Sequence, residues 1–142
     1  MAERLLGGCH CGNLRLEFHA AGRFEDLPIR ACQCSFCRKH NVRATADPGG
    51  RLDIAVRNRD SLSAYRMGHG ITDYLVCREC GVYVAAVMED EDEGGLLATC
   101  IVNALDVAPE RVSDPVPINY DGETPELRRG RRRQRWMPAR MI

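Results

Sequence analysis

Long apolar runs are missing from this sequence, and their absence excludes several classes of protein. Nothing in its 142 residues approaches the roughly 18 consecutive apolar residues that a membrane-spanning helix needs. The opening residues, MAERLLGG, also lack the apolar core of a secretory signal. We therefore expect a soluble cytoplasmic protein with no membrane partner.

Net charge is missing too. The 20 basic and 20 acidic side chains cancel, so no global field selects nucleic acid as a partner. The charge is uneven locally, because residues 89–93 are acidic and residues 128–135 are rich in arginine. Such a run is typical of a solvated tail, and only Trp136 beside it offers a ring for base stacking. The sequence argues against nucleic-acid binding; the arginines could pair with the acidic segment, within the chain or across a homodimer.

Sustained helical periodicity and internal repeats are absent as well. With 44% hydrophobic residues, the chain can form one packed domain. Alternating or β-branched segments between turn residues predict strands, and single helical turns are expected near 59–65 and 107–112. The prediction is a mainly β fold of small antiparallel sheets with little helix. Its strands are expected within 13–19, 51–56, 72–77, 81–88 and 95–105.

The domain expected from this pattern covers residues 1–113. Residues 114–142 contain several prolines and the arginine run, which favour an irregular C-terminal arm. We expect this arm to belong to the same domain or to be partly disordered.

Cysteine is what the sequence has in abundance. Eight cysteines without a secretion signal indicate metal or thiol chemistry in a reducing compartment, in preference to disulfides. Cys100 stands alone in an apolar segment and is expected to be a small buried core residue. The other seven form a Cys-x-Cys pair, a Cys-x-Cys-x-x-Cys trio and a Cys-x-x-Cys pair.

The two pairs predict a closed metal site. Side chains two apart in a strand point the same way, so Cys9 and Cys11 can hold one ion. Cys77 and Cys80 form a zinc knuckle, in which Gly81 permits a positive φ. Four thiolates from two distant pairs are typical of structural zinc. We therefore assign these four cysteines to one structural zinc ion.

The trio of Cys32, Cys34 and Cys37 is then one ligand short of a closed site. Three protein ligands with an open position are typical of catalytic zinc. One alternative is a second structural ion, completed by His10, His19, His40 or His69. Another is a zinc ribbon that joins Cys34-x-x-Cys37 to Cys77-x-x-Cys80 and leaves three cysteines without a role.

The sequence contains four motifs in the order GGCHCG, CQCSFCRK, CRECG and IVNALD. With these motifs it resembles the glutathione-dependent formaldehyde-activating enzyme family, also called the centromere protein V domain. The resemblance runs from Gly7 to about Asp106. It implies an all-β zinc fold known as a β-tent, with two zinc ions per chain. Structural zinc on the two pairs and catalytic zinc on the trio are also implied. The family's founding activity is a carbon–sulfur lyase reaction, the condensation of formaldehyde with glutathione to S-hydroxymethylglutathione or its reverse.

Zinc held by thiolates is a soft Lewis acid, which suits a substrate thiol beside a small aldehyde. Arg38 and Lys39 follow the trio and are candidates for binding the carboxylates of a thiol such as glutathione, or are ordinary surface cations. His40 and His69 are candidate proton carriers. We expect a zinc-dependent carbon–sulfur lyase acting on a thiol–aldehyde adduct. The alternatives are a non-catalytic zinc-stabilised module, whose basic arm binds nucleic acid or a protein, and a purely structural protein.

Overall fold

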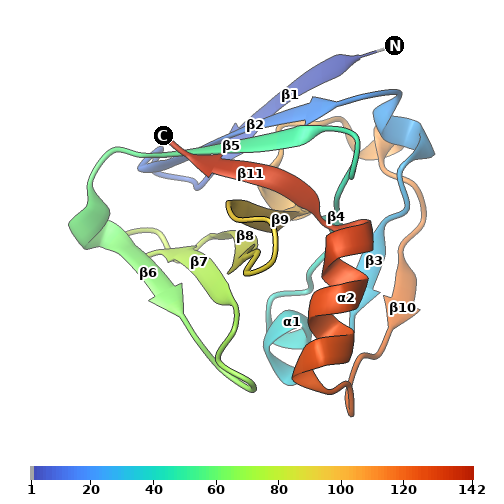
Figure 1. Ribbon diagram of the computed structural model, residues 1–142. Helices are drawn as coiled ribbons and strands as arrows, with labels where there is room; N and C mark the ends of the chain where they lie inside the picture. The colour runs from blue at the N-terminus through green and yellow to red at the C-terminus, as the bar shows by residue number, and fades with distance from the viewer. Residues whose placement is uncertain (1) are drawn as a thin grey trace.

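One mixed sheet organises the molecule. The structure, a computed structural model, describes residues 2–142, and eleven strands of these residues belong to the sheet (Figure 1). The main path runs β1-β2-β5-β11-β9-β4-β3-β10, while β8 pairs with β9 and leads to β7 and β6. The strands are β1 (Glu3–Gly8), β2 (Leu14–Ala20), β3 (Arg30–Cys32), β4 (Ala44–Thr45), β5 (Arg51–Val56), β6 (Leu62–Tyr65), β7 (Asp73–Cys77), β8 (Tyr83–Glu89), β9 (Leu96–Ile101), β10 (Val116–Ile118) and β11 (Met137–Met141).

The predicted mainly β class is confirmed, and the alternating segments form the strands expected of them. In β2, Leu14, Leu16 and Phe18 are fully buried while their neighbours are more exposed, because successive side chains of a strand point to opposite faces. Burying each such side chain contributes about 1.5–3 kcal/mol to folding. The helical turns expected near 59–65 and 107–112 are the 3-10 turns Arg59–Ser61 and Pro109–Arg111.

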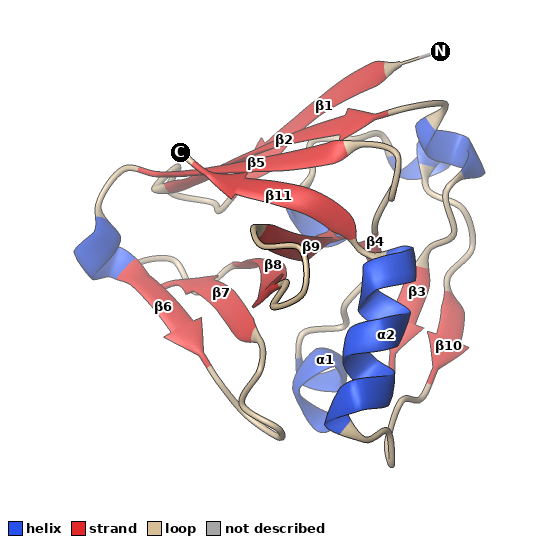
Figure 2. Ribbon diagram, in the orientation of Figure 1, coloured by secondary structure: helices blue, strands red, loops and turns tan. Residues whose placement is uncertain are grey.

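Most strand pairs are antiparallel, as expected, but two are parallel. Strand β10 runs parallel to β3, and β11 runs parallel to β5. Figures 1 and 2 show β1, β2, β5 and β11 as an upper layer, with β6, β7 and β8 below on one side. Helices α1 (Ser35–Lys39) and α2 (Pro125–Arg135) lie below on the other side, with β3 and β10. The remaining short elements are the 3-10 turns Phe24–Asp26 and Val102–Ala104.

The expectation of an irregular C-terminal arm is wrong. Helix α2 begins after Thr124, whose side chain accepts a hydrogen bond from the Leu127 N–H at 3.2 Å, and has proline at its first position. Strand β11 follows directly and lies inside the sheet between β5 and β9. The side chains of Met137 and Ala139 are buried there. The arm therefore completes the sheet, and neither of the two α-helices in residues 2–142 is long and apolar enough to cross a membrane.

Two apolar clusters fill the interior. The larger cluster lies beneath the upper layer and includes Phe18, Ile54, Val84 and Cys100. The smaller cluster gathers Cys37, Tyr74, Tyr83 and Trp136 from α1, β7, β8 and the end of α2. The two cysteine-rich sites are attached to different clusters, since Cys9 and Cys77 belong to the larger one.

Candidate metal centres

The four paired cysteines come together in one cluster, which we call the closed cluster. All four Sγ atoms lie within 4.8 Å of one another, and Cys11 Sγ is 3.7 Å from that of Cys9 and 3.6 Å from that of Cys77. Zinc–sulfur bonds of about 2.3 Å place the ligands of a tetrahedral site about 3.8 Å apart. The closed cluster, Cys9, Cys11, Cys77 and Cys80, therefore has the spacing of a four-thiolate site and could hold a metal ion.

Local backbone geometry explains why these four sulfurs converge. Cys77 ends β7, and the following turn closes with the Gly81 N–H donating to the Cys77 carbonyl at 2.9 Å. Gly81 has a φ of 77°, a conformation that favours glycine. At the other pair, the Leu14 N–H donates a hydrogen bond to Cys9 Sγ at 3.2 Å and fixes the position of this sulfur. The site is thus built by the backbone from segments more than 60 residues apart.

The second cluster, which we call the open trio, is built locally. Cys32 ends β3, Cys34 caps α1, and Cys37 lies inside α1. Their Sγ atoms lie within 4.8 Å of one another, and the Cys37 N–H donates to Cys34 Sγ at 3.4 Å. Hydrogen bonds from Cys32 and then Cys37 lower the pKa of Cys34, so this sulfur carries thiolate character. The open trio also could hold a metal ion.

A fourth protein ligand is not part of the open trio. Within residues 2–142, no His, Asp or Glu ligand atom joins the three sulfurs. His40 packs instead against the ring of Phe36, with centroids 4.6 Å apart, and His69 Nε2 donates a hydrogen bond to the Glu123 carbonyl oxygen at 2.9 Å. The ribbon alternative is wrong, because Cys77 and Cys80 lie with the first pair. All eight cysteines are free, and Cys100 is fully buried, as expected.

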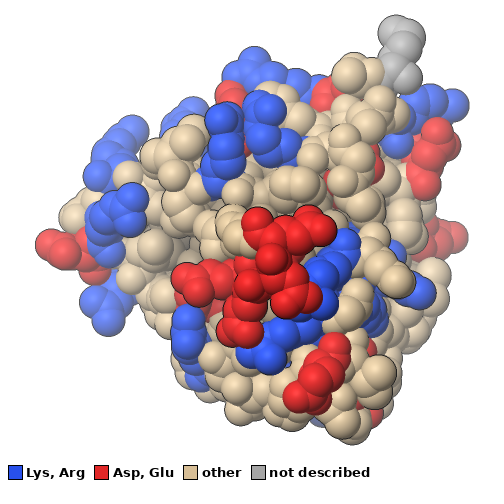
Figure 3. Space-filling model, in the orientation of Figure 1, with Lys and Arg blue, Asp and Glu red and all other residues tan. Residues whose placement is uncertain are grey.

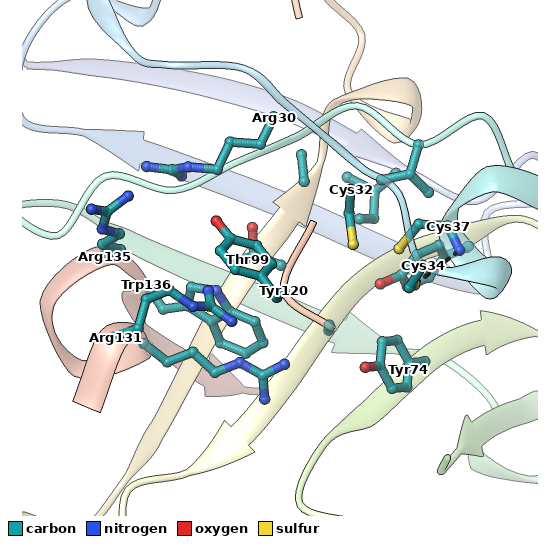
Figure 4. A pocket seen from close by; sticks show the side chains of 16 residues that line it. Arg30, Cys32, Cys34, Cys37, Tyr74, Thr99, Tyr120, Arg131, Arg135 and Trp136 are labelled. Carbon is teal, nitrogen blue, oxygen red and sulfur yellow. Dashed lines mark hydrogen bonds between the residues drawn. The ribbon is translucent and has the colours of Figure 1, made fainter. Parts of the chain in front are cut away.

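The open trio lines two cavities that share several lining residues, and Figure 4 shows the first of them. The first, which we call the inner pocket, has a volume of ≈ 80 Å³ and is lined by all three cysteines. The second, the outer cleft, has a volume of ≈ 940 Å³ and is lined by Cys32 and Cys34. Tyr74 lines both cavities. A molecule bound at the trio can therefore extend in two directions.

Arginines form part of the wall of the inner pocket. Arg30 comes from β3, while Arg131, Arg132 and Arg135 come from α2. Arg132 is only 5% exposed, and this burial lowers its pKa to about 10. Its guanidinium lies 4.2 Å from the centroid of the Trp136 ring and contacts the Thr72 hydroxyl. The pocket thus places positive charge in a largely apolar setting.

Aromatic side chains pack together beside the trio, around Phe36 of α1. The ring of Phe36 contacts those of Tyr74 and Tyr83, with centroids 5.2 and 5.1 Å away. Burial raises the pKa of both tyrosines, so their phenols keep their protons at neutral pH. A protonated phenol can donate a hydrogen bond, and both tyrosines line the inner pocket.

The residues predicted to bind substrate lie apart from the inner pocket. Arg38, Lys39 and His40 are exposed on α1 and just after it, and of the three only Arg38 lines the outer cleft. The arginines of the inner pocket were missed as site residues. Three of the four, Arg131, Arg132 and Arg135, belong to the run at 128–135, which the sequence shows clearly but which was interpreted as a solvated tail.

Much of the remaining arginine run pairs with the acidic segment, one of the arrangements considered from sequence. Arg133 contacts Asp92 at 2.8 Å and Asp90 at 3.3 Å, and Arg129 contacts Glu91 at 3.5 Å. Figure 3 shows acidic side chains gathered in the middle of one face, next to basic ones. These contacts lie within the chain and occupy arginines that a nucleic acid would need.

The comparisons with known proteins bear on the fold. No family model matches this sequence. The crystal structure of a Rhodobacter sphaeroides protein, solved by structural genomics, is similar, with 25% sequence identity and a TM-score of 0.60. The match covers 80% of this chain and 99% of that chain. The two proteins therefore share a fold across most of their length.

Proposed function

We propose that this protein is a zinc-dependent carbon–sulfur lyase that forms or cleaves the adduct of a thiol and an aldehyde, and that it is a member of the glutathione-dependent formaldehyde-activating enzyme family. The observation that carries the proposal is the open trio, three cysteines without a fourth protein ligand, which lines two cavities. A reducing cytoplasm suits a chain with eight free thiols.

Both cysteine clusters fit zinc, one ion in each. The closed cluster supplies four thiolates and has a structural role, while the open trio supplies three. Zinc bound there would supply a soft Lewis acid with an open position for a substrate thiolate. In the forward reaction the thiol sulfur bonds to the carbonyl carbon and the thiol proton ends on the carbonyl oxygen. The reverse reaction breaks the same carbon–sulfur bond, and neither direction needs an oxidant.

The residues around the trio bind and orient the two substrates. The outer cleft has the volume of a site for a peptide-sized molecule, so the thiol binds there. Arg38 lines this cleft and attracts carboxylates, such as those of glutathione. The aldehyde enters the smaller inner pocket, and the Tyr74 phenol, which lines both cavities, donates a hydrogen bond to the carbonyl oxygen.

Exchange spectroscopy by NMR tests the proposal directly. Formaldehyde and glutathione are mixed with and without the zinc-loaded protein, and small thiols are run in parallel. We expect the protein to accelerate the exchange between free and adduct formaldehyde. Cys34→Ser should abolish this acceleration, whereas Cys100→Ala, which removes a thiol outside both clusters, should retain it. The proposal would be contradicted if the zinc-loaded protein left the exchange rate unchanged for every thiol and aldehyde.

A further inference from the structure

Three arginines of the inner pocket have no acidic partner. Among residues 2–142, Arg30, Arg132 and Arg135 make no ion pair, and all three line this pocket. Their neighbours on α2 differ, because Arg131 pairs with Glu123 at 2.7 Å and Arg133 pairs with Asp92 at 2.8 Å. Three guanidinium groups without an acidic partner among the described residues therefore line one cavity.

Unsatisfied polar atoms occur at the same cavity. Among the described residues, the buried side-chain nitrogen and oxygen atoms that lack a hydrogen-bond partner are the Tyr120 hydroxyl and Arg132 Nε. Both residues line the inner pocket and also border the outer cleft, and only 5% of Arg132 is exposed. Buried polar groups are normally hydrogen-bonded, and each unsatisfied one calls for an explanation. A ligand that accepts hydrogen bonds would satisfy both atoms.

The arrangement of charge defines the ligand. A buried guanidinium is costly without a counter-charge, and its planar donors match the two oxygens of a carboxylate or phosphate. Figure 4 shows Arg30 and Arg135 at one end of the pocket and the three cysteines at the other, with Tyr120 between them. Arg131 also lines this pocket, beside Arg30 and Arg135. The pocket therefore combines a thiolate end and a cationic end.

We propose that the inner pocket is an oxyanion subsite, so that the aldehyde half of the adduct carries a carboxylate or a phosphate. This inference rests on the proposed function, in which the aldehyde occupies the inner pocket and the thiol the outer cleft. Formaldehyde is neutral and would leave the cationic end without a partner. The volume of ≈ 80 Å³ holds several water-sized groups, since one water needs roughly 10–15 Å³, so the substrate is a short aldehyde acid or aldehyde phosphate.

The chemistry is unchanged by this substrate class. The thiol sulfur forms a bond to the aldehyde carbon, the carbonyl π bond breaks, and the thiol proton is transferred to the oxygen. The carboxylate or phosphate takes no part in bond making and only positions the carbonyl beside the open trio. Arg30, Arg132 and Arg135 therefore act as binding residues for the charged group.

Direct titration of anions tests the subsite without any turnover. Sodium acetate and sodium phosphate are titrated into the zinc-loaded full-length chain by calorimetry at constant ionic strength. Arg30→Met and Arg135→Met are suitable variants because these side chains are less buried than Arg132. A charge-assisted hydrogen bond contributes enough that each variant should weaken anion binding about tenfold or more. Arg133→Met, a matched change on the same helix but outside the pocket, should bind anions like the wild type.

A second arm measures substrate preference. Glyoxylate and glycolaldehyde phosphate are compared with glycolaldehyde, a neutral aldehyde of similar size, in adduct formation with the same thiol. We expect kcat/KM to be about tenfold or more higher for at least one anionic aldehyde, and this preference to disappear in Arg30→Met and Arg135→Met. Preference for glyoxylate identifies a carboxylate subsite, and preference for the phosphate identifies a phosphate subsite.

The two proposals fail in different ways. If formaldehyde exchange is accelerated but neither anion binds, the oxyanion subsite is wrong and the lyase function stands. The three arginines then only balance the negative charge of the thiolates. If anion binding depends on Arg30 and Arg135 but no aldehyde reacts, the subsite stands and the lyase function, together with the assignment of the anion to an aldehyde, is wrong.

Discussion

The closed cluster and the open trio use the same ligand type but are built in different ways. Two cysteines of the closed cluster lie just after β1, and the other two lie at the end of β7 and in the turn that follows it. These segments are far apart in sequence. The open trio comes from a single segment of six residues around the start of α1. Cross-linking distant segments restricts the unfolded chain, whereas binding within one short segment does so far less. Under the proposed function, this difference would let one cluster hold the fold together and leave the other available for chemistry.

Substitution of one cysteine in each cluster gives the largest expected contrast. Cys77→Ser should lower the free energy of unfolding by several kcal/mol and leave a poorly folded chain, because metal binding at such a site is coupled to folding. Cys34→Ser should lose about one metal ion per chain and unfold close to the wild-type temperature. Circular dichroism melting and metal analysis measure both effects. If the two variants melt alike, the distinction between the clusters is wrong.

Chelation tests the same contrast without mutation. Freshly purified, reduced protein should contain about two zinc ions per chain, one for each cluster. A chelator should remove the ion of the open trio first, because three thiolates and an exchangeable ligand bind more weakly than four thiolates. The time course is followed by colorimetric zinc release. Release of both ions in one phase would mean that the two clusters bind zinc equally tightly.

A third cluster of possible ligands sharpens the comparison. Glu17, His19 and Asp53 lie within 4.8 Å of one another on β2 and β5. Asp53, only 3% exposed, already binds Arg140 at 2.9 Å and Arg51 at 3.0 Å. We therefore expect no third metal ion, and native mass spectrometry of the zinc-loaded protein should show two.

The pH dependence of stability should reveal what Asp53 does instead. Hydrogen bonds from Arg140 and then Arg51 lower its pKa to about 2, from a usual value of 3.8. The interactions that lower this pKa contribute their full stabilisation above about pH 4, where the carboxyl is ionised in both the folded and the unfolded chain. This contribution is lost as the pH falls towards about 2. Asp53→Asn should cost about 1–2 kcal/mol at pH 7 and much less at pH 2.5, as measured by urea unfolding. A cost independent of pH would show that packing, and not charge, is responsible.

The ion pairs between α2 and the acidic segment should have the smallest effect. Arg133→Met removes contacts to Asp90 and Asp92, one of which is largely exposed. Exposed pairs of this kind contribute about 0–1 kcal/mol, so the melting temperature should change little. Zinc content should not change, since these residues touch neither cluster. A large loss of stability would mean that the acidic contact fixes the position of α2 and the pocket wall.

Sequence spacing was enough to predict both clusters, because metal ligation demands cysteines at fixed intervals near turns. Alternation was enough for β2 and β5, whose buried and exposed residues follow the period of a strand. Helix α2 was missed because its inward-facing residues include Arg132, which an apolar periodicity does not detect. The inner pocket was missed for a related reason. It joins Arg30 to arginines about 100 residues later, and only the folded topology brings them together.

The connection between α2 and β11 has a consequence for how this protein tolerates shortening. The helix that carries the pocket arginines continues without a loop into a strand that lies between two others in the sheet. A series of C-terminal deletions through residues 124–141 would therefore remove the pocket arginines and disrupt the sheet at the same time. Limited proteolysis should accordingly yield either the intact chain or small fragments, and no trimmed species that keeps its shape.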